Sequence, residues 1–541
     1  MTGEALLHVD GLRAAYRRGH EDTEVLHGIT LTLERGQTLA VVGESGSGKT
    51  TTAQAILGLL PSGGRRTAGT IRFNGEDIGA ASGRRLRALR GAEIGWIPQD
   101  PNNSLNPIAP VGEAVAEVLR VHGWGDRESR RARVHSLLDR VGIPEPDVRA
   151  AQYPHELSGG MKQRVLIAAA VALEPMLLIA DEATSALDVT VQRTILDLID
   201  ELRRDAGTAV LLVTHDLAVA ADRSDSLAVL RAGELREQGP TPLVLAAPQD
   251  GYTRQLLADA PALAPAAPRP PLPPDTPVVI RAEGLVQEFP RADGAGTSRV
   301  VDDVGFAVSA GSTHAIIGES GSGKTTTARI VMGFQHPTAG SVRVLDTEII
   351  GRTRAEMRTL RRQVQMVYQN PYGSLDPRLS VEKIVREPLD NYRIGTAAER
   401  RSRVRDMLAR VALPPDVARR RARELSGGQR QRVAIARALI LDPAVVVLDE
   451  AVSALDVTVQ AQILDLLDEL QRDLGVAYLF ISHDLAVVRR IARTVSVMRN
   501  GELVESGTTE QVFTSPQHEY TRRLLDAIPG RGVRPAALNG A

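Results

Sequence analysis

The strongest constraint on the fold is that the chain repeats itself. The run GESGSGKTTTA occurs at 43–53 and again at 318–328, and LSGG occurs at 157–160 and 425–428. The 22 residues at 181–202 return at 449–470 with 18 identities. A repeat of about 270 residues has the size of a whole domain. The sequence therefore predicts a duplicated domain and not a solenoid of small units.

A proline-rich segment joins the two halves. Residues 261–277 contain eight prolines in 17 positions, a composition that is incompatible with helix or sheet interior and favours polyproline II. We therefore expect a first domain at 1–260, a spacer at 261–277 and a second domain at 278–541. At about 3.1 Å per residue the spacer could reach roughly 50 Å, enough to let two domains pack in opposite orientations.

Composition excludes several classes of protein. Lys+Arg is 65 and Asp+Glu is 66, so the overall basic charge typical of nucleic-acid binders is missing. Cysteine is absent, which excludes disulfides, thiolate catalysis and Cys-ligated zinc or iron–sulfur clusters. We find no signal peptide and no apolar run long enough to span a membrane. We expect a cytosolic chain that could still dock onto a membrane protein.

Each half has the pattern of an α/β domain. Short apolar runs without alternation at 39–42, 177–180 and 210–213 are typical of buried parallel strands. The first run leads into a glycine-rich turn, and a helix is predicted to begin near Lys49. Residues 105–175 have a mostly helical pattern. The predicted fold class is therefore α/β in both halves.

Each half also contains one loop with the pattern G-x-x-x-x-G-K-[ST]. In such a loop the backbone N–H groups surround a polyphosphate, the lysine reaches the β- and γ-phosphates and the Thr hydroxyl coordinates Mg²⁺. The chain has only four lysines, and Lys49 and Lys324 are two of them. The candidate phosphate-binding residues are Gly43, Ser45, Gly46, Gly48, Lys49, Thr50 and Thr51 in the first loop and Gly318, Ser320, Gly321, Gly323, Lys324, Thr325 and Thr326 in the second.

An acidic pair ends a predicted strand in each half, Asp181–Glu182 in the first and Asp449–Glu450 in the second. A carboxylate at the C-terminal edge of a parallel strand lies beside the phosphate loop. The Asp can hold Mg²⁺ and the Glu can polarise an attacking water. The alternative is an acidic pair at a helix start. We favour the catalytic interpretation because the pair follows a phosphate loop twice.

A histidine and a glutamine complete the set in each half. His215 and His483 follow the next predicted strand, so we expect them at the same sheet edge, in contact with a γ-phosphate. Gln99 and Gln369 each follow a short apolar run and precede irregular chain. Glutamine could supply a neutral ligand for Mg²⁺ or water, and a loop amide without a role is an equal alternative.

Serine-glycine turns provide a second anion-binding feature. Ser158, Gly159 and Gly160, and their counterparts Ser426, Gly427 and Gly428, each precede a long helical stretch, where backbone N–H groups favour anions. Each half thus has two phosphate-binding surfaces but one lysine loop. This surplus is explained if the turn of one half closes over the nucleotide of the other.

Together these motifs make the chain resemble the ATP-binding subunits of ABC transporters, with two subunits fused in tandem. The resemblance extends to the SALD turns at 185–188 and 453–456. It implies two P-loop NTPase domains, each with a mostly parallel core sheet, an antiparallel β subdomain and a helical subdomain. It also implies that Tyr16 and Phe289 stack on adenine, with packing in the β subdomain as the alternative.

Finer features resemble the oligopeptide, dipeptide and nickel importer branch. They are QDPNNSLNP, QNPYGSLDPR and the tails at 250–261 and 518–529. Some members have a cysteine cluster that holds an iron–sulfur centre, and this chain lacks it. DEAT and DEAV replace the common DEPT run, although the Asp, the Glu and the SALD turn remain.

The resemblance implies an ATP- and Mg²⁺-dependent importer motor at the cytoplasmic face of the membrane. The first composite site would combine its own loop with Ser426–Gly428, and the second its loop with Ser158–Gly160. Expected partners are two membrane permease subunits and, indirectly, an extracytoplasmic solute-binding protein, without nucleic acid. Peptide is the default substrate, with nickel or another small solute as the alternative.

Two other functions remain open. One is a soluble tandem ABC protein that acts on ribosomes or DNA. It is disfavoured because the spacer is short and proline-rich and because cysteine is absent. The other is an exporter ATPase of the same family.

Overall fold

The computed structural model describes residues 5–19, 21–184, 187–263, 269–270, 272–290, 296–453 and 455–530. The described residues divide into two compact units. Residues 5–263 with 529–530 form the first, and residues 269–528 form the second. No helix among the described residues is both long and apolar enough to cross a bilayer.

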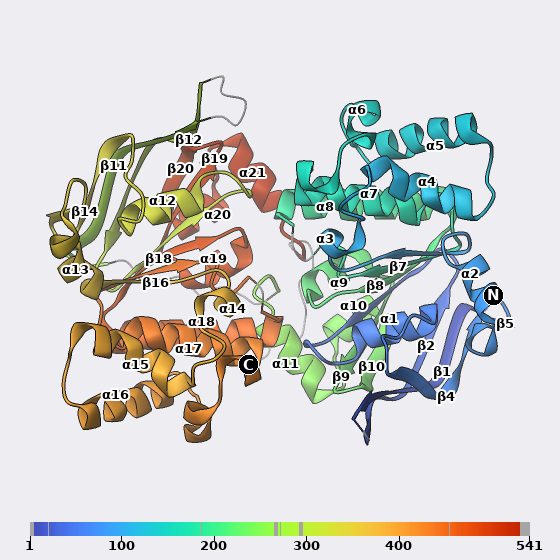
Figure 1. Ribbon diagram of the computed structural model, residues 1–541, viewed down its shortest axis with the longest axis horizontal. Coiled ribbons are helices and arrows are strands. Elements are labelled where there is room, and N and C mark those ends of the chain that lie inside the picture. The colour runs from blue at the N-terminus through green and yellow to red at the C-terminus, as the bar shows by residue number, and fades with distance from the viewer. Residues whose placement is uncertain are drawn as a thin grey trace. The chain divides into compact units, whose positions relative to one another are not determined.

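A six-stranded sheet forms the centre of the first unit, with the strand order β10-β9-β3-β8-β7-β6 (Figure 1). Five strands run parallel and β10 pairs antiparallel at the edge. The strands are β3 (Thr38–Val42), β6 (Ile94–Ile97), β7 (Leu177–Asp181), β8 (Ala209–Val213), β9 (Ser226–Arg231) and β10 (Glu234–Pro240). The expectation of parallel strands is confirmed.

Both faces of this sheet are covered. Leu177 and Ile179 of β7 pack in one apolar cluster, and their neighbours Leu178 and Ala180 pack in another on the opposite face. Burial on both faces explains why the strands appear in the sequence as apolar runs without alternation.

A smaller antiparallel sheet and one helix cover one face of the core sheet of the first unit. The sheet has the order β2-β1-β4-β5. Its strands are β1 (Ala5–Arg18), β2 (Glu21–Glu34), β4 (Gly64–Phe73) and β5 (Glu76–Asp77). Leu31 and Ile71 of this sheet share a core with Val41 of β3 and with Ala53 of α1 (Lys49–Leu57).

Helices cover the other face of the core sheet of the first unit. In Figure 1 this group lies on the side of the core sheet away from β1, β2 and β4. Its members are α4 (Val111–Val121), α5 (Arg127–Arg140), α6 (Pro146–Ala150), α7 (Gly159–Ala170) and α8 (Val189–Ala206). The remaining helices are α2 (Gly83–Leu89), α3 (Pro101–Ser104), α9 (Leu217–Arg223), α10 (Thr241–Ala246) and α11 (Gly251–Asp259).

The second unit repeats both sheets. Its core sheet has the order β16-β17-β18-β13-β19-β20 and its antiparallel sheet the order β12-β11-β14-β15. The core strands are β13 (Thr313–Ile317), β16 (Val364–Val367), β17 (Val445–Asp449), β18 (Ala477–Ser482), β19 (Thr494–Arg499) and β20 (Glu502–Thr508). The others are β11 (Val278–Pro290), β12 (Thr297–Ser309), β14 (Ala339–Val344) and β15 (Thr347–Glu348).

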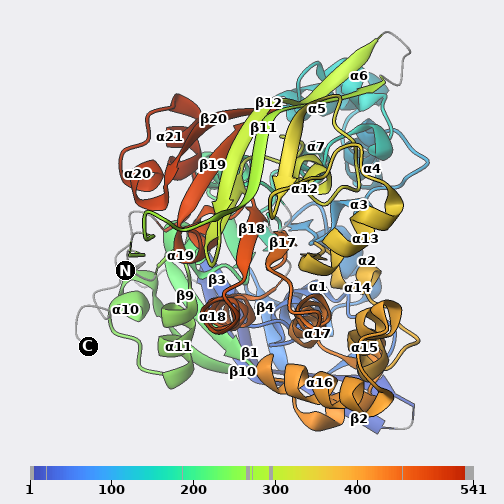
Figure 2. The ribbon, with the colours of Figure 1, turned by 90° about the vertical axis from the view of Figure 1, so that its left-hand side faces the viewer.

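The helices of the second unit are distributed as in the first. In Figure 2, α15, α16 and α17 group on one side of the core strand β18, and β11, β12 and β14 lie on the other. The helices are α12 (Lys324–Val331), α13 (Arg354–Gln363), α14 (Pro371–Ser374), α15 (Val381–Tyr392), α16 (Ala397–Arg410), α17 (Gly427–Leu439), α18 (Val457–Leu474), α19 (Leu485–Ile491), α20 (Thr509–Thr514) and α21 (Glu519–Asp526).

Two predicted features are only partly described. Of the spacer 261–277, the described residues 261–263, 269–270 and 272–277 form no helix or strand. Within it, Arg269 donates to Asp468 at 2.8 Å and to the carbonyl of Arg490 at 2.8 Å. Of the SALD turns, Ser185, Ala186 and Ala454 lie outside the described residues.

Candidate functional site

The candidate site of the first unit forms at one edge of its core sheet. The parallel strands β3, β6, β7 and β8 all end at this edge, as expected for a ligand crevice in an open α/β sheet. Each strand is followed by predicted site residues. They are the loop Gly43–Thr50 after β3, Gln99 after β6, Glu182 after β7 and His215 after β8.

The phosphate loop has a backbone that requires glycine. Gly43 has φ 152°, and a Cβ atom there would lie 2.1 Å from the carbonyl oxygen of Leu230. Gly48, the N-cap of α1, has φ 101°, and its Cβ would meet a Leu26 methyl at 2.6 Å. The loop can therefore pass close to its neighbours only with glycine at these two positions.

The loop has the form that a phosphate needs. Its crest, Ser45 and Gly46, is exposed, and a Cβ at Gly46 would have no atom within 4 Å. Behind the crest, the Lys49 side chain is buried, and its Nζ donates to the carbonyls of Gly43 and Glu44 at 2.8 and 2.9 Å. A cation under the loop and a helix N-terminus behind it favour an anion at the crest.

An acidic residue lies beside the loop. Thr50 Oγ1 donates to Asp181 Oδ1 at 3.0 Å. Burial raises the pKa of Asp181 to about 6, although the Thr50 hydrogen bond lowers it. Hydroxyl and carboxylate oxygens are ligands that Mg²⁺ prefers, and a cation here would offset the unfavourable burial of the charge. The residues present therefore fit a magnesium ion.

Glu182 is held between two side chains. Gln99 Nε2 donates to Glu182 Oε2 at 2.8 Å, and His215 Nδ1 lies 3.3 Å from Oε1. Burial raises the pKa of Glu182, but the His215 hydrogen bond and charge outweigh it, so the net pKa is lowered. Burial likewise lowers the pKa of His215, but Glu182 reverses the effect and the net pKa is raised. The carboxylate is thus kept ionised and oriented.

The backbone at Glu182 is strained. Its φ is 46°, a left-handed conformation that costs a non-glycine residue about 1–3 kcal/mol. The N–H of Glu182 donates to the Val213 carbonyl at 2.8 Å, which extends the β7–β8 pairing and holds the conformation. Strain of this kind gathers at functional sites.

The second unit reproduces the loop. Lys324 Nζ donates to the carbonyls of Gly318 and Glu319 at 2.7 Å each, and Thr325 donates to Asp449 at 3.2 Å. Burial raises the pKa of Asp449, as it does for its counterpart in the first unit.

The second unit also reproduces the side-chain contacts around the glutamate. Gln369 donates to Glu450 at 2.8 Å, and His483 Nδ1 lies 3.4 Å from the same carboxylate. Glu450 again has φ 46°. Burial raises its pKa and His483 outweighs the effect, so the net pKa is lowered. The geometry is therefore a property of the repeat and not of one copy.

The two aromatic residues predicted to stack on adenine lie on the antiparallel sheets. Tyr16 is half-buried, with its hydroxyl 3.5 Å from Thr51 Oγ1 at the start of α1. Phe289 is near the end of β11 and is 39% exposed. Thr326 occupies the position of Thr51 at the start of α12.

The serine-glycine turns lie on other elements, at the N-termini of α7 and α17. Ser158 and Ser426 are the N-caps, and their hydroxyls each accept a backbone N–H at 3.3 Å. A Cβ at Gly160 would lie 2.8 Å from Val191, and one at Gly428 2.5 Å from Val459. Helix packing therefore requires glycine at both positions. Gly159 and Gly427 are the first residues of these helices.

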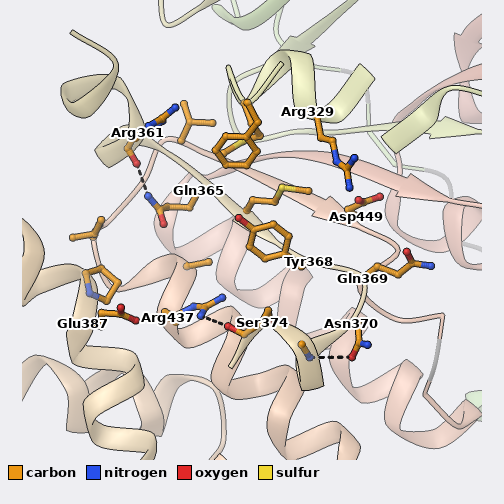
Figure 3. A pocket seen from close by; sticks show the side chains of 18 of the residues that line it. Arg329, Arg361, Gln365, Tyr368, Gln369, Asn370, Ser374, Glu387, Arg437 and Asp449 are labelled. Carbon is orange, nitrogen blue, oxygen red and sulfur yellow. Dashed lines mark hydrogen bonds between the residues drawn. The ribbon is translucent and has the colours of Figure 1, made fainter. Parts of the chain in front are cut away.

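A hollow of about 710 Å³ adjoins the site of the second unit (Figure 3). Its lining includes Gln369 and Asp449 at the sheet edge and Glu387 and Tyr392 of α15. Arg437 donates to the Ser374 carbonyl at 2.6 Å in its wall. The loop that carries Gln369 thus connects the sheet edge with the helical group.

One buried loop serine in each unit was not among the predicted site residues. The hydroxyls of Ser47 and Ser322 are buried and have no hydrogen-bond partner among the described residues. Both occupy variable positions of the glycine-rich pattern, so the pattern itself could not single them out.

Comparison with known proteins identifies the family. Residues 26–185 and 301–453 match the ABC transporter family, and residues 504–536 match the oligopeptide/dipeptide transporter C-terminal region. The chain belongs to the ABC transporter family, and its relatives, which are import ATP-binding proteins, identify it as the ATP-hydrolysing motor subunit of an importer.

Its relatives include the glutathione import ATP-binding proteins GsiA. The protein from Pectobacterium atrosepticum is 42% identical, and the alignment covers 97% of this chain and 89% of the relative. The protein from Escherichia coli O6:H1 is 41% identical over the same shares. Among solved structures, the ATP-binding cassette MJ0796 in a dimeric post-hydrolysis state with ADP and Pi is 29% identical. That match covers 43% of this chain and 98% of that chain, with a TM-score of 0.40.

Proposed function

We propose that each unit hydrolyses Mg²⁺-ATP at the edge of its core sheet and that the two reactions drive uptake of a small peptide. One observation carries the proposal: the same set of a lysine, threonine, aspartate, glutamate, glutamine and histidine converges at this edge in both units. We therefore assign two hydrolytic sites and not one active and one degenerate site.

The phosphate loop binds the nucleotide in this mechanism. Backbone N–H groups of the loop and Lys49 contact the phosphates, and Lys324 does so in the second unit. Thr50, Asp181 and Gln99 hold Mg²⁺ in the first unit, and Thr325, Asp449 and Gln369 hold it in the second. When bound, Mg²⁺ neutralises charge on the phosphate oxygens.

The glutamate orients and polarises the attacking water. Glu182 and Glu450 remain ionised because the histidine beside each one lowers its pKa, and an ionised carboxylate can accept a proton from water. His215 and His483 fix the carboxylate orientation and contact the γ-phosphate. Tyr16 and Phe289 stack on the adenine.

Replacement of both glutamates tests this assignment. The variant Glu182→Gln plus Glu450→Gln should lose ATP turnover by at least about 100-fold, the scale of a missing general base, and still bind Mg²⁺-ATP. Phosphate release and equilibrium binding measure the two quantities. Turnover close to that of the unmodified chain would refute the role of these glutamates.

We further propose that Ser426–Gly428 completes the first site and Ser158–Gly160 the second. Each turn supports this role as the N-terminus of a helix of 12 or more residues. In a Lys324→Ala chain, which retains only the first site, Ser426→Ala should lower turnover far more than Ser158→Ala. An equal effect of the two substitutions would rule out this pairing.

Two membrane permease subunits are the proposed partners, with the protein at the cytoplasmic face of the membrane. The hollow beside Gln369 is a suitable contact surface because it adjoins the Mg²⁺ ligands and exposes the aromatic residues Phe334 and Tyr368. A solute-binding protein would deliver the substrate to the permeases. Glutathione, in the name of the relatives, is one small peptide of the proposed class.

Partner capture tests the transport function. The double Glu→Gln variant would carry a tag, receive Mg²⁺-ATP in detergent-solubilised cells and be purified. We expect two integral membrane proteins with several spans each to co-purify. Ribosomes or DNA-repair proteins without a membrane protein would overturn the transport function and leave the ATPase chemistry intact.

A further inference from the structure

The tail helix of each unit touches the phosphate loop. The hydroxyl of Tyr252, at the start of α11, accepts the backbone N–H of Glu44 at 3.1 Å. In the second unit the hydroxyl of Tyr520, at the start of α21, accepts the N–H of Glu319 at 3.3 Å. Both tyrosines are buried, with 4% and 3% of their surface exposed. The tails therefore have a defined contact with the residue that follows the first glycine of each loop.

The contact bears on the nucleotide-binding lysine. Lys49 Nζ donates to the carbonyl of the same Glu44 whose N–H is held by Tyr252, and Lys324 does the same at Glu319. The lysine thus holds the carbonyl group of this residue, and the tyrosine holds its N–H group. Because Tyr252 belongs to a separate element, its hydrogen bond can hold the loop in place independently of the lysine.

The tyrosine ring is itself fixed. The guanidinium of Arg231, at the end of β9, lies 4.7 Å from the centre of the Tyr252 ring, and Arg499 lies 4.9 Å from the Tyr520 ring. Asp250 caps α11 by accepting the N–H of Tyr252 itself at 2.8 Å. The orientation of the hydroxyl is therefore set before any ligand binds.

A carboxylate anchors the tail to the core sheet. Glu237 of β10 accepts the N–H groups of Gln249 and Asp250 at 2.8 and 3.1 Å, just before α11. Glu505 of β20 accepts those before α21 at the same distances. A continuous series of hydrogen bonds thus runs from the edge strand through the tail helix to the phosphate loop.

The repeat shows that the contact does not depend on the detail of the tail. The residue before the helix is Asp250 in the first unit and His518 in the second, and both cap the helix. The helices also differ in most exposed positions, whereas the tyrosine and its contact are the same.

We propose that Tyr252 and Tyr520 are positioning residues for ATP, which act through the backbone amides of Glu44 and Glu319 and set the affinity of each phosphate loop. This inference rests on the assignment of these loops as the ATP sites. The tail helix, outside the nucleotide-binding motifs, is thereby a structural part of each site.

The test uses the full chain with Glu182→Gln, Glu450→Gln and Lys324→Ala, which retains only the first ATP site and does not hydrolyse. Tyr252→Phe keeps the ring but leaves the Glu44 N–H without its acceptor. We expect Mg²⁺-ATP binding to weaken about three- to tenfold, which corresponds to about 0.6–1.4 kcal/mol. In the Lys324→Ala chain with Glu182 and Glu450 intact, Tyr252→Phe should raise KM for ATP, while kcat at saturating ATP stays within about twofold.

Tyr478→Phe is the matched control. Its hydroxyl also bonds a backbone group, because it donates to the Leu467 carbonyl at 3.1 Å. Tyr478 pairs with Thr313 at the start of β13 in the second unit, at the end of the core sheet away from the phosphate loop. Comparable losses of thermal stability in the two variants, with weaker ATP binding only in Tyr252→Phe, would support the inference. Unchanged binding in Tyr252→Phe, or equal weakening in both, would overturn it.

A further variant separates this inference from the site assignment. Lys49→Ala in the same chain should abolish ATP binding. If it does and Tyr252→Phe has no effect, the positioning role alone is refuted. If Lys49→Ala retains full binding, the loop is not the ATP site and both proposals are refuted.

Discussion

At the scale of single residues, each phosphate loop depends on a lysine that arginine cannot replace. The chain uses arginine for nearly all its basic positions, yet Lys49 and Lys324 remain lysine. The structure gives the reason. Each ammonium group lies between two backbone carbonyls, with only 5% of the residue exposed, and a planar guanidinium has neither the size nor the geometry for that position.

Lys49→Arg should therefore inactivate the first site as fully as Lys49→Ala, although charge is conserved. We expect ATP binding at that site to fall at least about tenfold, the effect of losing a charged hydrogen bond of about 1.5 kcal/mol or more. Lys383→Arg, at an exposed position of α15, is the control and should change nothing. Normal binding in Lys49→Arg would show that charge alone suffices.

Gly43→Ala should disrupt the same loop by a different route. Its Cβ would lie 2.1 Å from the Leu230 carbonyl, so the backbone of the loop must move. We expect loss of ATP binding together with a lower unfolding midpoint. Gly207→Ala, with φ 65° but no atom within 4 Å of the new Cβ, should cost only about 1–2 kcal/mol of stability. If both variants bind ATP equally, close packing of the loop is not essential.

At the scale of elements, the repeat allows two versions of one strand to be compared. Strand β13 has His314 where β3 has Leu39. His314 is buried against Phe306, with ring centres 5.3 Å apart, and its ring nitrogens contact Thr494 and Ser496. Burial lowers the pKa of His314 to about 4, so the ring is neutral in the folded unit at pH 7.

The second unit should therefore lose stability in mild acid. The unfolded chain binds a proton at His314 near pH 6.5, but the folded chain does so only near pH 4. Stability is full above about pH 6.5 and falls as the pH drops towards 4, by roughly 3 kcal/mol in total. His314→Leu should remove this dependence.

Amide hydrogen exchange measures this pH dependence of stability in one sample, because peptides from β3 and β13 report the two units separately. We expect exchange of β13 to increase between pH 7 and pH 5, after correction for the intrinsic rate, while that of β3 does not. The same response in both strands, or in the His314→Leu variant, would contradict the prediction.

Sequence patterns predicted the elements that carry motifs better than the contacts between them. β3, β7 and β8 could be predicted because burial on both faces leaves an apolar run that ends at a polar site residue. The bond between Tyr252 and Glu44 could not, because it joins residues 208 positions apart. Nor could the left-handed backbone at Glu182, which arises from pairing with Val213.

At the scale of the whole molecule, we assign two equivalent sites to one chain. The distances that define the site differ between the units by no more than about 0.2 Å at the lysine, threonine, glutamine and histidine contacts. Because the geometry is shared, the chemistry should be shared as well. Either Glu182→Gln or Glu450→Gln alone should then lower turnover, and neither site should be dispensable for the full rate.

The number of Mg²⁺-ATP molecules bound per chain in the Glu182→Gln, Glu450→Gln variant at saturating nucleotide decides whether both sites are complete. We expect two, falling to one with either Lys49→Ala or Lys324→Ala and to none with both. One bound nucleotide in the variant with both lysines intact would contradict the claim that the duplicated sites are both complete.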